Sequence, residues 1–272
     1  MSAVITLTTD FGLSDAFVAA MKGIILGINP SVTLVDISHD IKPQNITQAA
    51  FVLSTAYSFF PKRTIHVVVV DPGVGTERKA VVLRTPDFDF VAPDNGVLSY
   101  VIQPYVAGRV KNNRQSLKTA GGLEAFAITE SRFWRSPVSA TFHGRDIFAP
   151  VAAHLSLGMI PSAFGPPVDS LTALPLSRPF RAPDGSLVGR VIHIDGFGNL
   201  ITDIAVRDLP PDTSDIKIKV RHRVIRSLSR TYGVSEGLLA LIGSSGCLEI
   251  SLRDGDAAAF LHARVGDKVA IS

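Results

Sequence analysis

A nearly uninterrupted apolar run over residues 65–70 ends abruptly at Asp71, and a Pro-Gly-Val-Gly turn follows at 72–75. Such a run is typical of a strand in a parallel sheet, which is buried because helices cover both of its faces. In open sheets of this kind, ligands bind beyond the carboxyl ends of the strands. Asp71 therefore occupies a position suited to a functional carboxylate, although an aspartate there also often caps a turn.

The first 160 residues alternate between strand-like and helix-like patterns. Strands are expected near 4–9, 32–37, 65–71, 79–85 and 88–92, and helices near 15–27, 45–59 and 146–157. Strands that alternate with helices along the chain usually form a mostly parallel sheet flanked by helices. We therefore expect an α/β domain over residues 1–160.

The pattern changes after residue 160. Six prolines between 161 and 189 indicate an extended connector. Short strand patterns separated by turns follow near 191–195, 200–204, 216–220, 238–242, 248–252 and 268–271. Residues 190–272 are therefore expected to form a smaller all-β domain, a barrel or a sandwich.

Composition narrows the function classes. Hydrophobic residues make up 46% of the 272 residues, charged residues make up 19%, and the net charge is +3. The basic residues near 217–223 alternate with apolar ones, which predicts a half-buried strand rather than a nucleic-acid surface. No apolar run approaches the ~20 residues of a membrane span. The single Cys247 excludes an internal disulfide and a multi-cysteine metal site. We expect a cytoplasmic protein that requires no metal or cofactor.

Two further segments carry side chains suited to chemistry. His143 stands directly before the apolar helix expected near 146–157, and Asp10 directly follows the first expected strand. Aspartate, arginine and histidine side chains brought to one crevice could orient and polarise a water molecule. An ionised carboxylate such as Asp10 can accept two hydrogen bonds from the diol of a ribose. A simple turn carboxylate is the alternative for Asp10.

Six short segments occur in the order found in the S-adenosylmethionine hydrolases, also called S-adenosylmethionine hydroxide adenosyltransferases, which are related to the fluorinase and chlorinase enzymes. The segments are 9–12, 70–76, 92–96, 142–146, 195–199 and 243–246. Each is a weak signal alone, but together they resemble this family over nearly the whole chain. The resemblance implies hydrolysis of S-adenosyl-L-methionine to adenosine and L-methionine, by in-line attack of an oriented water or hydroxide on ribose C5′.

The resemblance also implies which side chains act. Asp71, Arg78 and His143 would form the catalytic triad that orients the water, and either Asp71 or His143 would accept its proton. The other positions that match the family would bind substrate. They are Asp10 at the ribose, Gln44, Val74 and Phe142 around it, Phe197 and Asn199 at the adenine, Asp195 at the methionine ammonium, and Ser244 and Ser245 at the methionine carboxylate. Without the resemblance, segments 195–199 and 243–246 are more typical of hairpin turns.

Departures from the halogenating relatives favour water as the nucleophile. Val74 and Gly144 stand where the fluorinase has the threonine and serine of its halide site, so both changes remove a hydroxyl. Gln44 replaces a tryptophan that stacks on the ligand there, and Ser245 replaces an arginine. The alternatives to hydrolysis are chlorinase-like halide transfer and a non-catalytic sensor of S-adenosylmethionine.

The resemblance further implies an assembly. Members of the family are trimers that bind the ligand between one subunit's N-terminal domain and its neighbour's C-terminal domain. In this chain the ribose and triad candidates precede residue 150, and the adenine and methionine candidates follow residue 190. A homotrimer with sites at the subunit interfaces is therefore expected.

Overall fold

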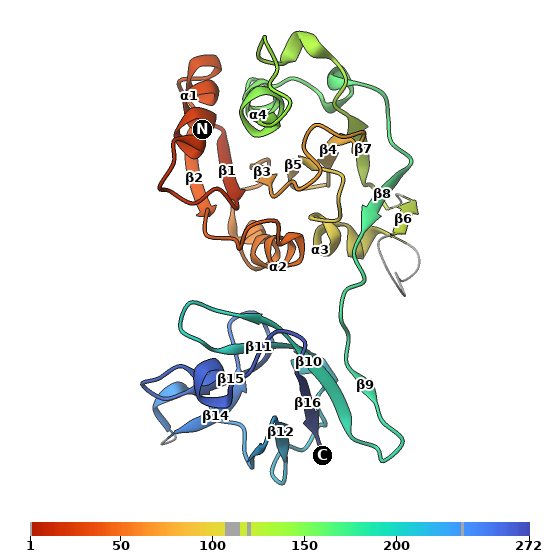
Figure 1. Cartoon of the computed structure of the whole chain (residues 1–272). Coiled ribbons are helices and arrows are strands. Elements are labelled where there is room, and N and C mark those ends of the chain that lie inside the picture. Colours follow the sequence, from red (N-terminus) through yellow and green to blue (C-terminus); the bar gives the residue numbers. More distant parts are fainter. Residues whose placement is uncertain (1, 107–114, 119–120, 235–236) are drawn as a thin grey trace. The chain divides into compact units, whose positions relative to one another are not determined.

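The computed structural model describes residues 2–106, 115–118, 121–234 and 237–272. The chain divides into two compact units, residues 1–176 and 177–272, which are described separately (Figure 1). Among the helices of the described residues, none is long and apolar enough to cross a membrane.

The first unit is built on a six-stranded sheet with the strand order β2-β1-β3-β5-β4-β7. Its strands are β1 (Val4–Thr9), β2 (Thr33–Ser38), β3 (Ile65–Val69), β4 (Ala80–Arg84), β5 (Asp89–Pro93) and β7 (Glu124–Ala127). The pairs among β2, β1, β3 and β5 are parallel, whereas β4 is antiparallel to both of its neighbours. The expectation of a mostly parallel sheet is confirmed.

Helices cover both faces of this sheet, with α1 (Phe17–Ile28) and α4 (Ala149–Ser156) on one side and α2 (Ile46–Ala56) and α3 (Ser99–Ile102) on the other (Figure 1). Successive side chains of β3 point to opposite faces. Val67 therefore packs into the core beneath α1 and α4, and Val68 into the core beneath α2 and α3. This double burial is the physical reason for the continuous apolar run.

Local signals set the helix boundaries. The Asn45 side chain accepts a hydrogen bond from the backbone N–H of Gln48 at 3.0 Å and so begins α2. The helix expected over 45–59 ends at Ala56 and continues as the 3₁₀ turn Tyr57–Phe59. The helix expected over 146–157 is α4, and the π-helical turn Gly144–Phe148 precedes it.

Several short elements have no counterpart in the pattern analysis. They include β6 (Gln115–Lys118), which pairs with β8 (Ser170–Ala173), together with α3 and β7. Each contains four residues, which is too few to establish a periodic pattern. The stretch 161–189 contains β8 in the first unit, and β9 (Phe180–Arg181) and the start of β10 (Leu187–Ile194) in the second.

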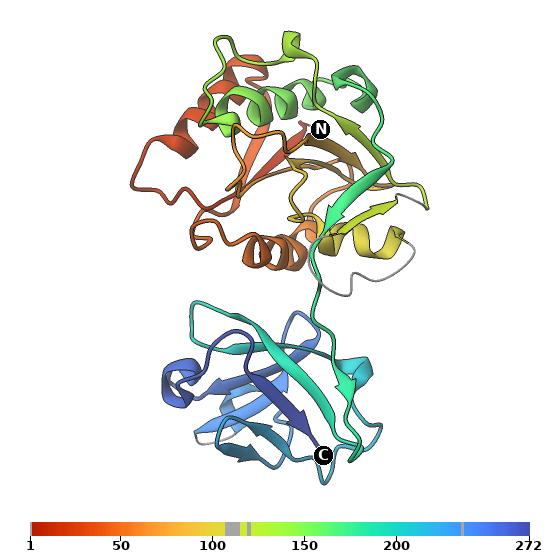
Figure 2. The same cartoon turned by 45° about the vertical axis from the view of Figure 1, so that its right-hand side comes forward.

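The second unit is an antiparallel, nearly closed barrel with the order β13-β12-β16-β10-β11-β15-β14 (Figure 2). Its strands are β10 (Leu187–Ile194), β11 (Leu200–Ala205), β12 (Ile218–Val220), β13 (Arg223–Ile225), β14 (Leu238–Ile242), β15 (Cys247–Leu252) and β16 (Lys268–Ile271). A bridge between Leu228 and Ala240 connects the chain after β13 to β14, so the two edge strands approach each other. The expected all-β fold is confirmed, and α5 (Ala257–Leu261) packs beside β15.

His66 makes the stability of the first unit depend on pH. The ring is fully buried, its Nδ1 lies 2.8 Å from Thr6 Oγ1, and it stacks on Phe90 with a centroid distance of 5.0 Å. Burial lowers the pKa of His66 to about 4, whereas an unfolded histidine has a pKa of about 6.5. The unfolded chain therefore binds the extra proton between these values, and the stability falls as the pH falls through this window.

We expect the free energy of unfolding of the first unit to decrease by up to about 3 kcal/mol between pH 7 and pH 4 because of His66. Urea titrations at several pH values on wild type and His66→Phe measure this. The variant should lose much of the pH dependence, whatever its absolute stability. The same pH slope in both proteins would contradict the assignment.

Candidate active site

The loop between β3 and β4 folds back so that the Arg78 guanidinium hydrogen-bonds the Asp71 carboxylate. Arg78 Nε lies 3.0 and 2.9 Å from the two carboxylate oxygens, and Nη2 lies 2.5 Å from Oδ2. Both side chains are largely buried, with exposures of 12% for Arg78 and 5% for Asp71. A Cβ on Gly73 would lie 3.1 Å from Arg78 Cγ, so the glycine leaves room for the arginine. The result is a shielded charge pair at the carboxyl edge of the sheet.

The same guanidinium also reaches His143, because Arg78 Nη2 lies 2.9 Å from His143 Nδ1. A guanidinium has no acceptor, so Nδ1 must accept this hydrogen bond and the neutral ring carries its hydrogen on Nε2. Burial, and then the charge of Arg78, lower the pKa of His143. His143 can therefore donate a hydrogen bond from Nε2 to a water oxygen, and Asp71 is the group able to take a proton from that water.

Close backbone packing brings the two parts of the triad together. Gly75 has a φ of +76°, and a Cβ there would lie 2.5 Å from the carbonyl oxygen of Ala140. Only glycine fits this position, because it tolerates both the left-handed conformation and the contact. The Asp71–Arg78 loop thus lies directly against the segment that leads into His143.

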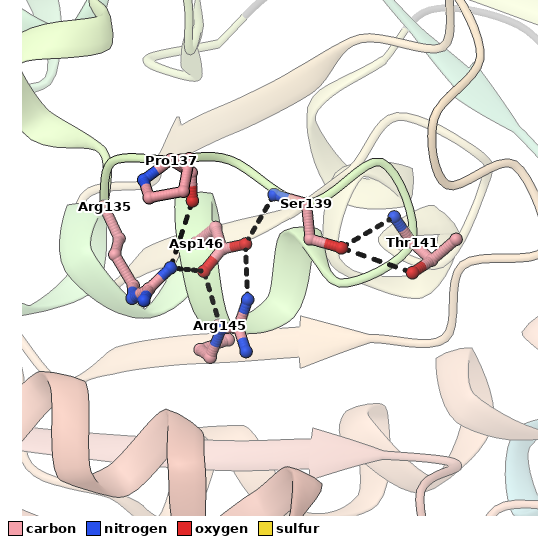
Figure 3. A network of polar contacts seen from close by, with 6 residues as sticks. All are labelled: Arg135, Pro137, Ser139, Thr141, Arg145 and Asp146. Carbon is pink, nitrogen blue, oxygen red and sulfur yellow. Dashed lines mark hydrogen bonds and ion pairs between the residues drawn. The ribbon is translucent and has the colours of Figure 1, made fainter.

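A buried carboxylate holds that second segment in shape (Figure 3). Asp146 accepts hydrogen bonds from Arg145 Nε at 2.7 Å and Nη2 at 2.9 Å, and from the Ser139 backbone N–H at 2.8 Å. Burial alone would raise the pKa of Asp146, but the hydrogen bonds from Arg145 and Ser139 outweigh it, and the pKa is lowered. Arg145 also lies over the ring of Phe142, 5.0 Å from its centroid. The Asp146 network therefore fixes the backbone on both sides of His143.

Residues of segment 92–96 hydrogen-bond the backbone at both ends of the Asp71–Arg78 loop. The side chain of Asn95 donates from Nδ2 to the carbonyl of Val70 at 2.9 Å, just before Asp71. The backbone N–H of Asp94 donates to the carbonyl of Lys79 at 2.8 Å, just after Arg78. Sequence reasoning missed this positioning role, because nothing local indicates which carbonyl groups the two residues reach.

The ribose candidates lie together on neighbouring loops. Asp10 Oδ2 accepts a hydrogen bond from the Gln44 backbone N–H at 2.7 Å, and Gln44 has a φ of +63°. The rings of Phe11 and Phe142 meet edge to face at 5.8 Å, which connects the Asp10 loop to the His143 segment. Val74 belongs to the triad loop itself, where its N–H donates to the carbonyl of Asp71 at 3.2 Å.

Gly144 lies in a crowded position beside these rings. A Cβ there would be 3.3 Å from Met21 Sδ and 3.3 Å from a ring carbon of Phe142. A side chain at this position would require those neighbours to give by a few tenths of an ångström. The local packing is therefore adapted to glycine.

The remaining candidates occupy two hairpin turns of the second unit. Asp195, Phe197 and Asn199 lie in the turn between β10 and β11, and Ser244 and Ser245 are exposed in the turn between β14 and β15. Leu200 pairs with Ile250 and Ala205 with Cys247, so the two turns lie toward opposite ends of β11. The Phe197 side chain is 81% exposed, whereas Asn199 is buried.

Tyr232 is another exposed ring of this unit, as are Phe180 and Phe260. Its hydroxyl donates to Glu249 Oε1 at 2.7 Å, and this hydrogen bond and burial raise the pKa of Tyr232 to about 12. Glu249 is itself buried and also accepts from Ser251 at 2.9 Å.

Within the described parts of the chain, no group of three or more His, Cys, Asp or Glu side chains could hold a metal ion.

Comparison with known proteins shows the family of the chain. The family model for the N-terminal domain of SAM hydroxide adenosyltransferases matches residues 5–165, and the model for their C-terminal domain matches residues 189–270. The (R)-S-adenosyl-L-methionine hydrolase of Salinispora tropica is 35% identical, over 98% of this chain and 97% of the relative. A crystal structure of an uncharacterized conserved protein from Thermotoga maritima has a TM-score of 0.86 and 37% identity, over 98% of this chain and 99% of that one.

More distant matches are also informative. A fluorinase from an Actinoplanes species is 27% identical over 76% of this chain and 73% of the relative. The chain is thus one of the enzymes that join an α/β domain to a β-barrel and act on an adenosyl group. Within that class it belongs to the S-adenosylmethionine hydroxide adenosyltransferase family, and the resemblance of its six segments to that family is confirmed.

Proposed function

We propose that this protein hydrolyses S-adenosyl-L-methionine to adenosine and L-methionine. The observation that best supports the proposal is that Arg78 hydrogen-bonds both Asp71 and His143. We infer that this arrangement offers a proton acceptor, a cation and an N–H donor to one small molecule. The curated relatives named as hydrolases are 32–37% identical over nearly the whole chain.

The proposed reaction is a direct displacement at ribose C5′. The sulfonium makes C5′ electrophilic, the water oxygen forms the new C–O bond, and the C5′–S electrons leave with methionine as a neutral thioether. His143 Nε2–H holds the water oxygen, Asp71 takes the released proton, and Arg78 offsets the developing negative charge. Positioning water in line with the C5′–S bond supplies much of the rate enhancement.

The other substrate contacts are proposed from the family resemblance. Asp10 would bind the ribose hydroxyls, with Gln44 and Phe142 beside it, and the exposed ring of Phe197 would stack on the adenine. The hairpin side chains would hold the two ends of the ligand: Asn199 the adenine, Asp195 the ammonium, and Ser244 and Ser245 the carboxylate. Cytoplasmic location stays a prediction from the sequence.

Product analysis tests the reaction. Purified protein incubated with S-adenosyl-L-methionine and chloride, without added metal or cofactor, should release adenosine and methionine in equal amounts by chromatography. Chlorinase-like transfer would instead give 5′-chloro-5′-deoxyadenosine as the main product, and a non-catalytic sensor would give no product. Either result, or S-adenosylhomocysteine as the main product, would overturn the proposal.

We further propose a homotrimer in which two subunits complete each active site. The support is the family resemblance, together with the division of candidates between two separately folded units. Mixing Asp71→Asn subunits with Asn199→Ala subunits should then restore part of the activity, because some sites would receive both intact halves. Each variant alone is the control. A fully active monomer, or no recovery after verified subunit exchange, would contradict the shared site.

A further inference from the structure

We propose that Asp195 selects the purine base, by fixing the side-chain amide of Asn199 in the one orientation that accepts a 6-aminopurine and rejects a 6-oxopurine. The inference rests on the proposed function in that the ligand is a nucleoside bound at this hairpin. It gives Asp195 a positioning role in addition to any contact with the methionine ammonium.

The Asp195 carboxylate is held by its own turn. Its Oδ1 accepts from the backbone N–H groups of Phe197 and Asn199, both at 2.9 Å. The backbone N–H of Asp195 in turn donates to the carbonyl of Asn199 at 3.1 Å. Two hydrogen bonds to Oδ1 hold the carboxylate, and the backbone bond closes the turn around it, so Oδ2 has a defined position.

That position determines the orientation of the Asn199 amide. Asn199 Nδ2 lies 3.0 Å from Asp195 Oδ2. A carboxylate only accepts hydrogen bonds, so the amide nitrogen must face it and Oδ1 must lie on the other side. Exchanging the two ends of the amide would place two oxygens in contact in a part-buried setting, which is unfavourable.

A fixed amide distinguishes bases by the group at purine position 6. Adenine presents an amino donor beside a ring acceptor, and an asparagine amide pairs with this edge through its oxygen and its second N–H. Hypoxanthine presents a carbonyl oxygen where adenine has the amino group, and this oxygen would oppose Asn199 Oδ1. We expect wild type to bind adenosine roughly 10–100-fold more tightly than inosine.

Asp195→Asn is the sharpest variant, because it keeps the shape of the side chain. Its Oδ1 can still accept from the backbone of the turn, but its Nδ2 would now face Asn199. The Asn199 amide must then turn over to accept that hydrogen bond, and it presents its nitrogen to position 6. The affinity for inosine should rise, and the affinity for adenosine should fall. Asp195→Ala removes the partner altogether and should make the two nucleosides nearly equal.

Isothermal titration of the full-length protein with adenosine and with inosine measures this choice without any chemical step. The matched control is Asp184→Asn, because Asp184 also closes a turn of the second unit, with Oδ1 3.0 Å from the Ser186 backbone nitrogen. We expect the adenosine-to-inosine affinity ratio to be unchanged in the control and to fall at least fivefold in Asp195→Asn, with Asp195→Ala between that variant and wild type.

The results separate this inference from the proposed reaction. A wild-type protein without a preference for adenosine, or a ratio that falls less than fivefold in both Asp195→Asn and Asp195→Ala, overturns the role of Asp195. If Asp195→Asn does not fold, Asp195→Ala decides alone. Selective adenosine binding in a protein that releases no adenosine from S-adenosylmethionine would overturn the hydrolase proposal and leave the base selection standing.

Discussion

Asp71→Asn is expected to lower kcat by roughly 10²–10⁴, the usual effect of removing a general acid–base group. Asparagine keeps the shape of the side chain but removes the charge that binds Arg78 through both oxygens. It also removes the group proposed to accept the proton of the attacking water. Adenosine release under saturating substrate measures kcat, and a thermal melt checks that the fold is kept.

Glu77→Gln is the matched control for this change. Glu77 lies in the same loop with an exposed side chain, so its kcat should stay within about twofold of wild type. An Asp71→Asn enzyme that also remains within about twofold would mean that the nucleophile is prepared by other groups. Loss of activity in both variants would indicate damage to the loop rather than to the chemistry.

His143→Ala is expected to reduce kcat by a similar factor while substrate binding is largely kept, because the ring acts on water rather than on the nucleoside. The wild-type pH profile provides a second measurement. Burial and the charge of Arg78 lower the pKa of His143, so the ring is neutral above that pKa and becomes protonated as the pH falls through it. Protonation ends the hydrogen bond from Arg78 to Nδ1, so kcat should decline as the pH falls through this lowered pKa, at a more acidic pH than for an ordinary histidine.

The residual activity of His143→Ala should lack this acidic decline, since the titrating group is gone. His222→Ala, which removes an exposed ring of the second unit, should keep the wild-type profile. An acidic limb that persists unchanged in His143→Ala would assign the pH dependence to another group. Unchanged turnover in this variant would remove His143 from the mechanism.

The parts of the fold that follow from sequence are those with long, repeated patterns. The run over 65–70 predicted a doubly buried strand, and Val67 and Val68 do pack into two different cores. The four-residue elements α3, β6 and β7 could not be predicted from sequence patterns. Their formation depends on tertiary partners, which a single sequence does not reveal.

The candidate site also contains some residues that the sequence predicts and some contacts that only the structure reveals. Motif order named Asp71, Arg78 and His143, and the structure brings these three side chains together. Sequence patterns gave no sign that Gly75 lies against the carbonyl of Ala140, or that Asn95 reaches Val70. These contacts join positions 25 to 65 residues apart, so only the folded chain reveals them.

The hydrogen bonds at both ends of the Asp71–Arg78 loop have an evolutionary consequence. Asn95 and Asp94 hold the residues that flank the loop through backbone carbonyl groups, which every amino acid possesses. Mutations inside the loop can therefore change the chemistry presented to the ligand without altering the anchors. The side chains of such a loop can be exchanged while the backbone contacts at its two ends stay the same. That property offers a physical route by which one ancestral scaffold could diverge toward different nucleophiles, as the similarity of this chain to both hydrolases and fluorinases suggests.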